Sequence, residues 1–330
     1  MLAALGLFVL GLVLLALGGD SLVKGASGLA RRGGVSPFVT GLVLVAFGTS
    51  LPEIAVNLHA IARGVPDLAL GNAIGSNVVN FGLTLGLAAL AAPLLVHWRA
   101  LNPLLLVLVA GTAALIVFGL DGSVSRLEGG VLVVAFVATL AFALSRASNE
   151  TPELQAELEG FSSTGTDLGL NLLRFAIALV LLYFGSRLVV VNALTLGAGW
   201  GLSPLLAGLV PVAIGSALPE VAAAIAAARR GQGDIVVGHV IGSSLFNLLV
   251  IVGAMALWQP VVLPGLLVRY ALPAALAFAL VIYPMLRGDL RIGRGEGGVL
   301  LVGFAVWLAF ELLLVGSASG VAATGGTGAG

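Results

Sequence analysis

The sequence contains no cysteine and very few charged residues. The absence of cysteine from all 330 positions excludes disulfide bonds and thiolate metal sites. Charged residues make up only 9% of the chain, their formal sum is zero, and no basic tract is present, so nucleic acid is excluded as a partner. The three histidines, His59, His97 and His239, are not paired at the spacing of metal ligands. These absences exclude most soluble enzymes and binding modules.

Apolar residues are instead abundant, at 59% of the chain with a mean hydropathy of +1.15. A soluble domain of this length carries more charge, so the composition predicts an all-α polytopic membrane protein. Met1 to Gly19 lacks the positively charged start of a signal peptide and is interpreted as a retained first span. Ten segments approach the ~20 residues that a bilayer requires. They are 2–22, 37–62, 68–90, 101–120, 127–144, 168–192, 204–228, 235–257, 266–286 and 298–315.

The chain is an internal duplication. Gly41–Glu53 reads GLVLVAFGTSLPE, and Gly208–Glu220 reads GLVPVAIGSALPE. The offset of 167 residues, 220 − 53, also relates Asn80 to Asn247. We expect a first five-helix repeat over 1–144, an acidic linker over 145–167, a second repeat over 168–315, and a disordered Gly/Ala tail over 316–330.

The distribution of lysine and arginine predicts the orientation of the spans. The loops after odd-numbered spans hold Lys24, Arg31, Arg32, Arg99, Arg146, Arg229, Arg230, Arg287, Arg291 and Arg294. Those after even-numbered spans hold only Arg63, Arg126 and Arg269. This bias predicts a cytoplasmic linker and two extracytoplasmic termini. Because each repeat has an odd number of helices, the repeats cross the membrane in opposite directions, which is typical of secondary transporters.

Each repeat places one glutamate at membrane depth. Glu53 precedes Arg63 by ten residues, and Glu220 precedes Arg230 by ten. Ten helical residues span ~15 Å, half of a ~30 Å hydrocarbon core, so both carboxylates are predicted near the midplane. A charge there costs roughly 3 kcal/mol or more and indicates a functional site. No lysine lies in a span, which favours a bound cation or a proton as the neutralising partner.

Oxygen-bearing side chains accompany both glutamates. Thr49 and Ser216 precede them by four residues and share their helical faces. In the next span of each repeat Ser76 pairs with Asn80 and Ser243 with Asn247, again four residues apart. Pro52 and Pro219 free carbonyl oxygens one turn earlier, and we expect the helices to break there. Hard oxygen ligands suit Ca²⁺ and Na⁺. Glycines at i, i+4, namely Gly71, Gly75, Gly238 and Gly242, predict close helix packing.

GTSLPE with GNAIGSNVVN (Gly71–Asn80), and GSALPE with GHVIGSSLFN (Gly238–Asn247), resemble the two alpha-repeats of the sodium/calcium exchanger family. The resemblance covers nearly the whole chain. It implies exchange of Ca²⁺ for Na⁺ by alternating access, with helices one and six sliding across a rigid core. It further implies that the ions bind to Glu53, Glu220, Asn80, Asn247, Ser76, Ser243 and to oxygens at Ala46, Thr49, Ala213 and Ser216.

Three positions depart from that family pattern. Ala217 lacks a hydroxyl, His239 replaces an asparagine, and Asn247 replaces the aspartate found in many exchangers. Asn247 limits the formal charge of the site to −2, which leaves the coupling stoichiometry and the driving ion open. The linker is also too short for the calcium-sensing domains of animal members, so we expect no such regulation.

The leading hypothesis is therefore a Na⁺-driven Ca²⁺ antiporter of a prokaryotic inner membrane, without enzymatic activity or a cofactor. One chain holds both half-sites, so a monomer suffices. A proton-driven Ca²⁺ antiporter is the alternative, because one of two close carboxylates can hold a proton. A third hypothesis, an intramembrane serine hydrolase, uses Ser50, Ser76 or Ser243 with His59 or His239, and only residue type supports it.

Overall fold

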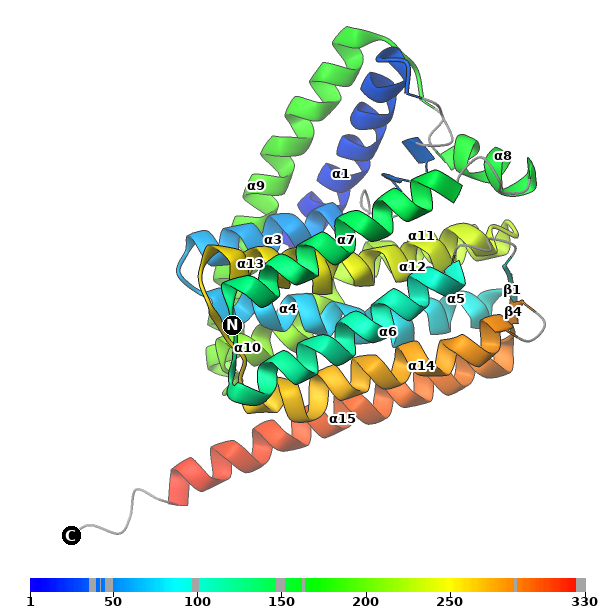
Figure 1. Ribbon diagram of the computed structural model, residues 1–330. Coiled ribbons are helices and arrows are strands. Elements are labelled where there is room, and N and C mark those ends of the chain that lie inside the picture. The colour runs from blue at the N-terminus through cyan, green and yellow to red at the C-terminus, as the bar shows by residue number, and fades with distance from the viewer. Residues whose placement is uncertain are drawn as a thin grey trace.

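The computed structural model describes residues 1–35, 40–41, 43–44, 50–96, 101–146, 152–161, 164–287 and 290–324, and it is a bundle of long helices (Figure 1). In the first repeat the helices are α1 (Leu2–Arg32), α3 (Leu51–Ala62), α4 (Pro66–Val79), η2 (Asn80–Leu85), α5 (Gly86–Ala91), α6 (Leu101–Phe118), η3 (Gly119–Asp121) and α7 (Arg126–Arg146). The helix α8 (Pro152–Phe161) follows in the linker. In the second repeat they are α9 (Leu168–Gly199), α10 (Pro204–Ala207), η5 (Gly208–Val212), α11 (Ala213–Arg229), α12 (Gly233–Leu245), η6 (Phe246–Val252), α13 (Gly253–Trp258), η7 (Leu267–Ala271), α14 (Leu272–Arg287) and α15 (Arg294–Thr324).

The described residues contain nine helical stretches long and apolar enough to cross a membrane, together with the shorter apolar helix α3. These stretches correspond to the predicted spans, and α3 forms the second half of the predicted span 37–62. The chain is thus an all-helical membrane protein, as its composition predicts. Most of the first half of span 37–62 lies outside the described residues.

Two short antiparallel ladders establish that the repeats are inverted. Strand β1 (Leu94–Leu95), after the third span, pairs with β4 (Arg291–Ile292), between the ninth and tenth spans. Strand β2 (Ser123–Val124), between the fourth and fifth spans, pairs with β3 (Val261–Val262), after the eighth. Repeats of the same orientation would place the partners of each ladder at opposite ends of the bundle. The loops can pair only because the repeats run in opposite directions.

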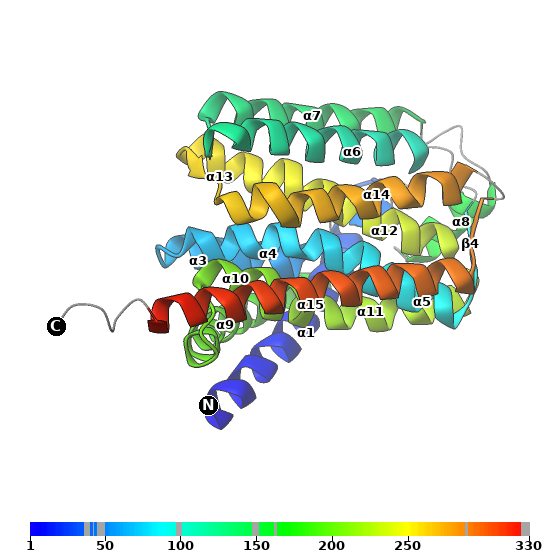
Figure 2. The same ribbon diagram turned by 90° about the horizontal axis from the view of Figure 1, so that it is seen from below.

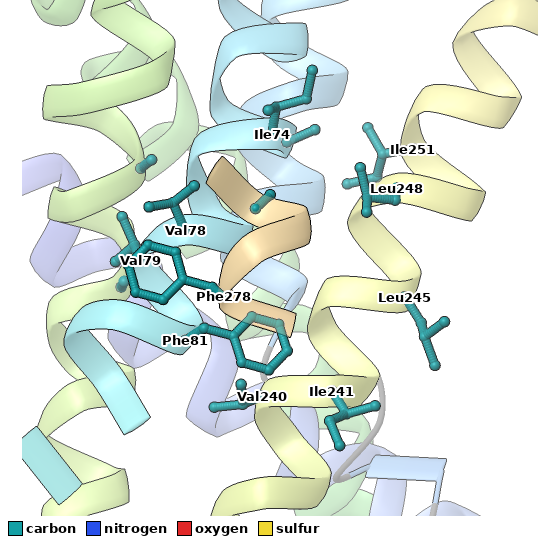
Figure 3. Close-up of a cluster of buried hydrophobic side chains, with 14 of the residues drawn as sticks. Ile74, Val78, Val79, Phe81, Val240, Ile241, Leu245, Leu248, Ile251 and Phe278 are labelled. Atoms are coloured by element: carbon teal, nitrogen blue, oxygen red, sulfur yellow. The ribbon is translucent and has the colours of Figure 1, made fainter. Parts of the chain in front are cut away.

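The third and eighth spans form the centre of the molecule. In their most apolar stretches 83% and 89% of the residues are buried, against at most 50% in the other candidate spans. Figure 3 shows buried side chains of both spans, with Phe81 of one span close to Val240 of the other. Any polar group on these two spans is consequently enclosed by protein.

Helices α1 and α9 form a separate pair at the edge of the bundle. They pack along each other for most of their length and touch the remaining helices much less. Figure 1 shows them side by side at a steep angle to the other helices, and Figure 2 shows α1 projecting from the bundle. Their outer surfaces carry exposed apolar side chains such as Leu7, Val13 and Phe184, as expected for contact with lipid.

The central helices contain π-helical turns at equivalent positions of the two repeats. Segment η2 begins at Asn80, and η6 spans Asn247. Such turns are frequent at functional sites because the extra residue per turn redirects side chains. The sequence predicted a break at Pro219, but α11 passes through Pro219 without interruption. The irregular turn of the seventh span is η5, which contains Pro211. The prediction of a break at Pro219 was wrong because packing against neighbouring helices keeps α11 helical although the proline lacks a backbone N–H.

Close contact across the glycines confirms the small-residue packing predicted for the first repeat. A Cβ atom at Gly71 would overlap the carbonyl oxygen of Leu205, and one at Gly75 would overlap that of Leu209. In return, Gly208 faces the carbonyl of Leu68. The glycines thus let α4 lie directly against α10 and η5, where the two repeats meet.

Two segments contain helix that the sequence analysis did not predict. The acidic linker contains α8, and α15 continues to Thr324, past Gly316 where the disordered tail was predicted to begin. Residues 316–324, GSASGVAAT, contain no proline, so a helix that has already formed can propagate through them. Residues 325–330 lie outside the described part of the chain.

We predict that Gly71→Ala destabilises the protein, because the new methyl group must displace the Leu205 carbonyl. Overpacking of this kind costs about 1–3 kcal/mol. Thermal unfolding in detergent measures the effect, with Gly298→Ala as the control, since no atom lies within 4 Å of a Cβ at Gly298. We expect a lower unfolding temperature for Gly71→Ala only. Equal unfolding temperatures for the two variants would contradict the packing described here.

Candidate ion-binding site

The two repeated glutamates meet inside the protein. Glu53 lies in the first turn of α3 and Glu220 lies in the middle of α11, and their side chains are only 1% and 6% exposed. The two carboxyl groups interact directly with each other. Each helix ends nine residues later, at Ala62 and Arg229, which is about 14 Å along a helix axis. The carboxyl pair therefore lies near the middle of the bundle, between helices that run toward opposite ends.

Ser243 connects the two repeats beside the carboxyl pair. Ser50 donates a hydrogen bond from its Oγ to Ser243 Oγ over 2.8 Å, and Asn80 donates one from Nδ2 over 3.2 Å. All three residues are buried. Ser50 and Asn80 belong to the first repeat and Ser243 to the second. The Ser243 hydroxyl group therefore joins the two repeats through two hydrogen bonds.

Several buried oxygen atoms of the predicted ligands have no hydrogen-bond partner among the residues that the structure describes. They are Glu53 Oε2, both carboxyl oxygens of Glu220, Ser76 Oγ, Asn80 Oδ1 and Asn247 Oδ1. A buried polar atom without a partner costs ~1–3 kcal/mol, so a cluster of them is stable only if something else satisfies it. Carboxylate, hydroxyl and amide oxygens are the ligands that Ca²⁺ and other hard cations prefer. The donor set therefore fits a transported cation.

The remaining predicted ligands fall into two groups. Ala213 and Ser216 are buried in α11, and Ser216 donates its Oγ hydrogen to the Ala213 carbonyl over 3.3 Å, so both oxygens lie one turn before Glu220. Their repeat counterparts, Ala46 and Thr49, lie outside the described residues. The ligand roles of all ten residues stay predictions.

Two residues near the site were given no ligand role from the sequence. The sequence predicts that His239, which takes the place of Asn72 in the other repeat, is a polar packing residue, yet its Nε2 lies 3.6 Å from Glu220 Oε2. Its counterpart Asn72 instead donates to Asn57 Oδ1 over 2.8 Å. Residue 224, the counterpart of Asn57, is alanine, which leaves His239 without the equivalent acceptor. Ser50 was considered only as a nucleophile. A comparison of Asn57 with its counterpart Ala224 would have shown from the sequence that His239 cannot make the hydrogen bond that Asn72 makes.

A third buried glutamate lies apart from the motifs. The sequence places Glu311 near the outer end of the tenth predicted span and predicts an interfacial side chain, but in α15 this side chain is completely buried. The prediction was wrong because it used only the position of Glu311 within the span. That position estimates the depth of the residue in the membrane, but it does not tell in which direction the side chain points. Leu144 occupies the equivalent position of the first repeat, so Glu311 has no repeated partner.

A carboxyl pair contributed by two inverted repeats and buried inside a membrane bundle is typical of a secondary transporter for cations. The particular family follows from comparison with known proteins. The sodium/calcium exchanger protein family model matches residues 3–145 and again residues 170–313. The chain belongs to this family. It is accordingly a membrane antiporter of the exchanger type and not an enzyme.

Named relatives and solved structures agree with this assignment. The chain is 38% identical to inner membrane protein YrbG of Escherichia coli over 94% of its own length and 97% of the relative. It is 34% identical to the putative antiporter CaxA of Alkalimonas amylolytica, covering 96% and 100%. The fold matches that of the sodium-calcium exchanger NCX_Mj with a TM-score of 0.66 and 30% identity, covering 93% and 98%.

We predict that Ser243→Ala weakens cation binding, because it removes the hydroxyl that accepts from both Ser50 and Asn80. Loss of these bonds costs on the order of 1–3 kcal/mol, equivalent to a roughly tenfold or greater loss of Ca²⁺ affinity. Calcium titration of the purified variant measures the effect. The control is Ser186→Ala, another buried serine, which bonds only to the Tyr183 carbonyl of its own helix. Unchanged affinity in Ser243→Ala would contradict the connecting role of this hydroxyl.

Proposed function

We propose that this protein is an antiporter that exchanges Ca²⁺ for Na⁺ by alternating access to a single site between its two repeats. The observation that carries the proposal is the interaction of the buried Glu53 and Glu220 carboxyl groups, together with buried oxygens of the other predicted ligands that have no hydrogen-bond partner among the described residues. The proposed side-chain ligands are Glu53, Glu220, Asn80, Asn247, Ser76, Ser243 and Ser216. The Ala213 carbonyl adds a further oxygen, and Ala46 and Thr49, the counterparts of Ala213 and Ser216, supply the equivalent oxygens of the first repeat.

The charge of the site explains why transport would be coupled. Two carboxylates carry a formal charge of −2, and the neighbouring Asn80 and Asn247 add none. One Ca²⁺ neutralises the pair, as do two Na⁺, whereas three Na⁺ leave a net charge of +1. Burying an uncompensated charge at membrane depth is costly, so the protein changes access readily only when the site is loaded. Competition between the two cations for one site then produces exchange.

The relatives support this choice of ions. The matching structure is that of a sodium-calcium exchanger whose crystals were soaked with Na⁺ and Sr²⁺, a divalent cation that resembles Ca²⁺. A second relative is described as a sodium/calcium exchanger of Methanosarcina acetivorans, and it is 28% identical over 92% of this chain.

Proton coupling is the alternative function, and the same carboxyl contact favours it. Repulsion between two adjacent carboxylates is relieved by a proton as well as by a metal ion. Two protons would balance one Ca²⁺ at this site. Proton-driven exchange would then proceed without Na⁺ under a pH gradient.

We further propose an inner-membrane location with both termini outside, so that the α8 end of the bundle faces the cytoplasm. The excess of lysine and arginine in the loops after odd-numbered spans supports this orientation, and the relative YrbG is an inner membrane protein. Because both glutamates belong to one chain, a monomer is sufficient for transport.

Calcium uptake into proteoliposomes preloaded with Na⁺ and diluted into Na⁺-free buffer at clamped pH tests the coupling. We predict uptake in the wild type and its loss in Glu53→Gln and Glu220→Gln, because neutralising either carboxyl group removes a ligand and half of the site charge. Glu311→Gln is the matched control, since it alters a buried glutamate on another helix, and it is expected to retain uptake.

The controls separate the alternatives. Wild-type flux in either site variant would refute the assignment of the glutamates. Calcium uptake that depends on an imposed pH gradient and not on the Na⁺ gradient would show that transport is coupled to protons and not to Na⁺.

The repeats offer a matched pair of residues for testing orientation. Arg63 and Arg230 are equivalent exposed positions at opposite ends of the bundle, and the chain has no native cysteine. On intact cells we predict that a membrane-impermeant maleimide labels the Arg63→Cys variant and spares Arg230→Cys until the cells are opened. The reverse pattern would invert the proposed orientation.

A further inference from the structure

Helix α8 of the linker is docked onto the transport core. Its apolar residues Leu154 and Leu158 are four positions apart, share one face, and are each only 1% exposed. The helix touches α12, the first part of the central eighth span. A free hydrophilic linker would leave these leucines in water, so the docked position is a specific contact.

Leu158 rests on a glycine of the repeated motif. The three atoms nearest to a Cβ placed at Gly41 all belong to Leu158, and its backbone carbonyl oxygen would be overlapped. The equivalent glycine of the second repeat is Gly208, and the atoms nearest its Cβ position belong to Leu68 and Asn72 of α4. Thus Gly208 is covered by a helix of the core, whereas Gly41 is covered by the linker. This difference between otherwise equivalent positions needs a cause.

The chain that follows α8 is fastened to the α1–α9 pair. Arg31 of α1 donates to the Thr164 carbonyl over 3.0 Å, and Arg174 of α9 donates to Thr164 Oγ1 over 3.1 Å. Asn171 of α9 donates from Nδ2 to the Gly165 carbonyl over 2.7 Å. The linker therefore connects the peripheral helix pair to the core at one end of the bundle.

We propose that α8 is a wedge that holds one end of the transporter in its present conformation and leaves Gly41 when the transporter changes access. This proposal rests on the alternating access of the proposed function. In an inverted-repeat transporter each repeat adopts in one state the arrangement of its partner in the other. Gly41 must then receive Ile235, the counterpart of Leu68, and Leu158 occupies that place now. Movement of the α1–α9 pair would draw the wedge out through Thr164.

The absence of native cysteine allows a direct test with a thiol reporter in the full-length protein. In the Leu158→Cys variant the thiol is protected while α8 is docked, so a membrane-impermeant maleimide reports release. Adding Gly41→Ala places a methyl group against the Leu158 carbonyl, and we expect roughly tenfold faster labelling or more. Gly6→Ala is the matched control, because a Cβ there meets nothing within 4 Å. Gly160→Cys, on the exposed side of α8, checks that reagent access is constant.

A second comparison measures movement during transport. Labelling of Leu158→Cys in proteoliposomes is expected to accelerate several-fold under opposing Na⁺ and Ca²⁺ gradients, relative to the same vesicles with no transported cation. Calcium flux is recorded in the same vesicles. Flux with constant labelling would overturn the wedge and leave the proposed function intact. Equal labelling in the Gly41→Ala and Gly6→Ala backgrounds would overturn the docking contact, whether or not exchange is observed.

Discussion

The carboxyl groups of Glu53 and Glu220 interact with each other inside a membrane bundle, and the arrangement of the rest of the structure positions them for this interaction. Adjacent carboxylates repel each other and lose their hydration when buried, so neither would persist there without compensation. The hydroxyl and amide oxygens proposed as ligands would complete a coordination shell for a cation, but they cannot themselves neutralise charge. Binding of a cation therefore offsets the free-energy cost of burying the two carboxylates, and this is the physical basis of the proposed coupled exchange.

The duplication supplies the geometry that this contact requires. Inversion lets two copies of one motif approach the midplane from opposite ends, and the β1–β4 and β2–β3 ladders join the copies at both ends. Glycines at Gly71, Gly75 and Gly208 bring the helices of the two repeats into backbone contact. The hydrogen bonds from Ser50 and Asn80 to Ser243 then set the position of the central spans relative to the carboxyl pair. Identity between the repeats is incomplete, and one of the departures, His239, lies beside Glu220.

The sequence predicted the features that depend on a repeated pattern and missed those that depend on three-dimensional neighbours. Hydropathy located the spans, and the 167-residue offset identified Glu53 and Glu220 together with the glycine contacts. The contact of His239 with Glu220 was not foreseen, because it arises from the loss of a partner at residue 224 on another helix. The uninterrupted helix at Pro219 and the burial of Glu311 were missed because packing decides both. The docking of Leu158 on Gly41 joins a linker to a motif, and no local pattern encodes such a contact.

Competition between Ca²⁺ and Na⁺ for one site can be measured by equilibrium titration. Calcium binding to the purified protein would be measured at a series of Na⁺ concentrations, with ionic strength held constant by a large organic cation. We predict that one Ca²⁺ binds per chain, and that the apparent Kd for Ca²⁺ rises with a power of the Na⁺ concentration while the number of bound Ca²⁺ at saturation stays constant. A Ca²⁺ affinity independent of Na⁺ would contradict a shared site between Glu53 and Glu220.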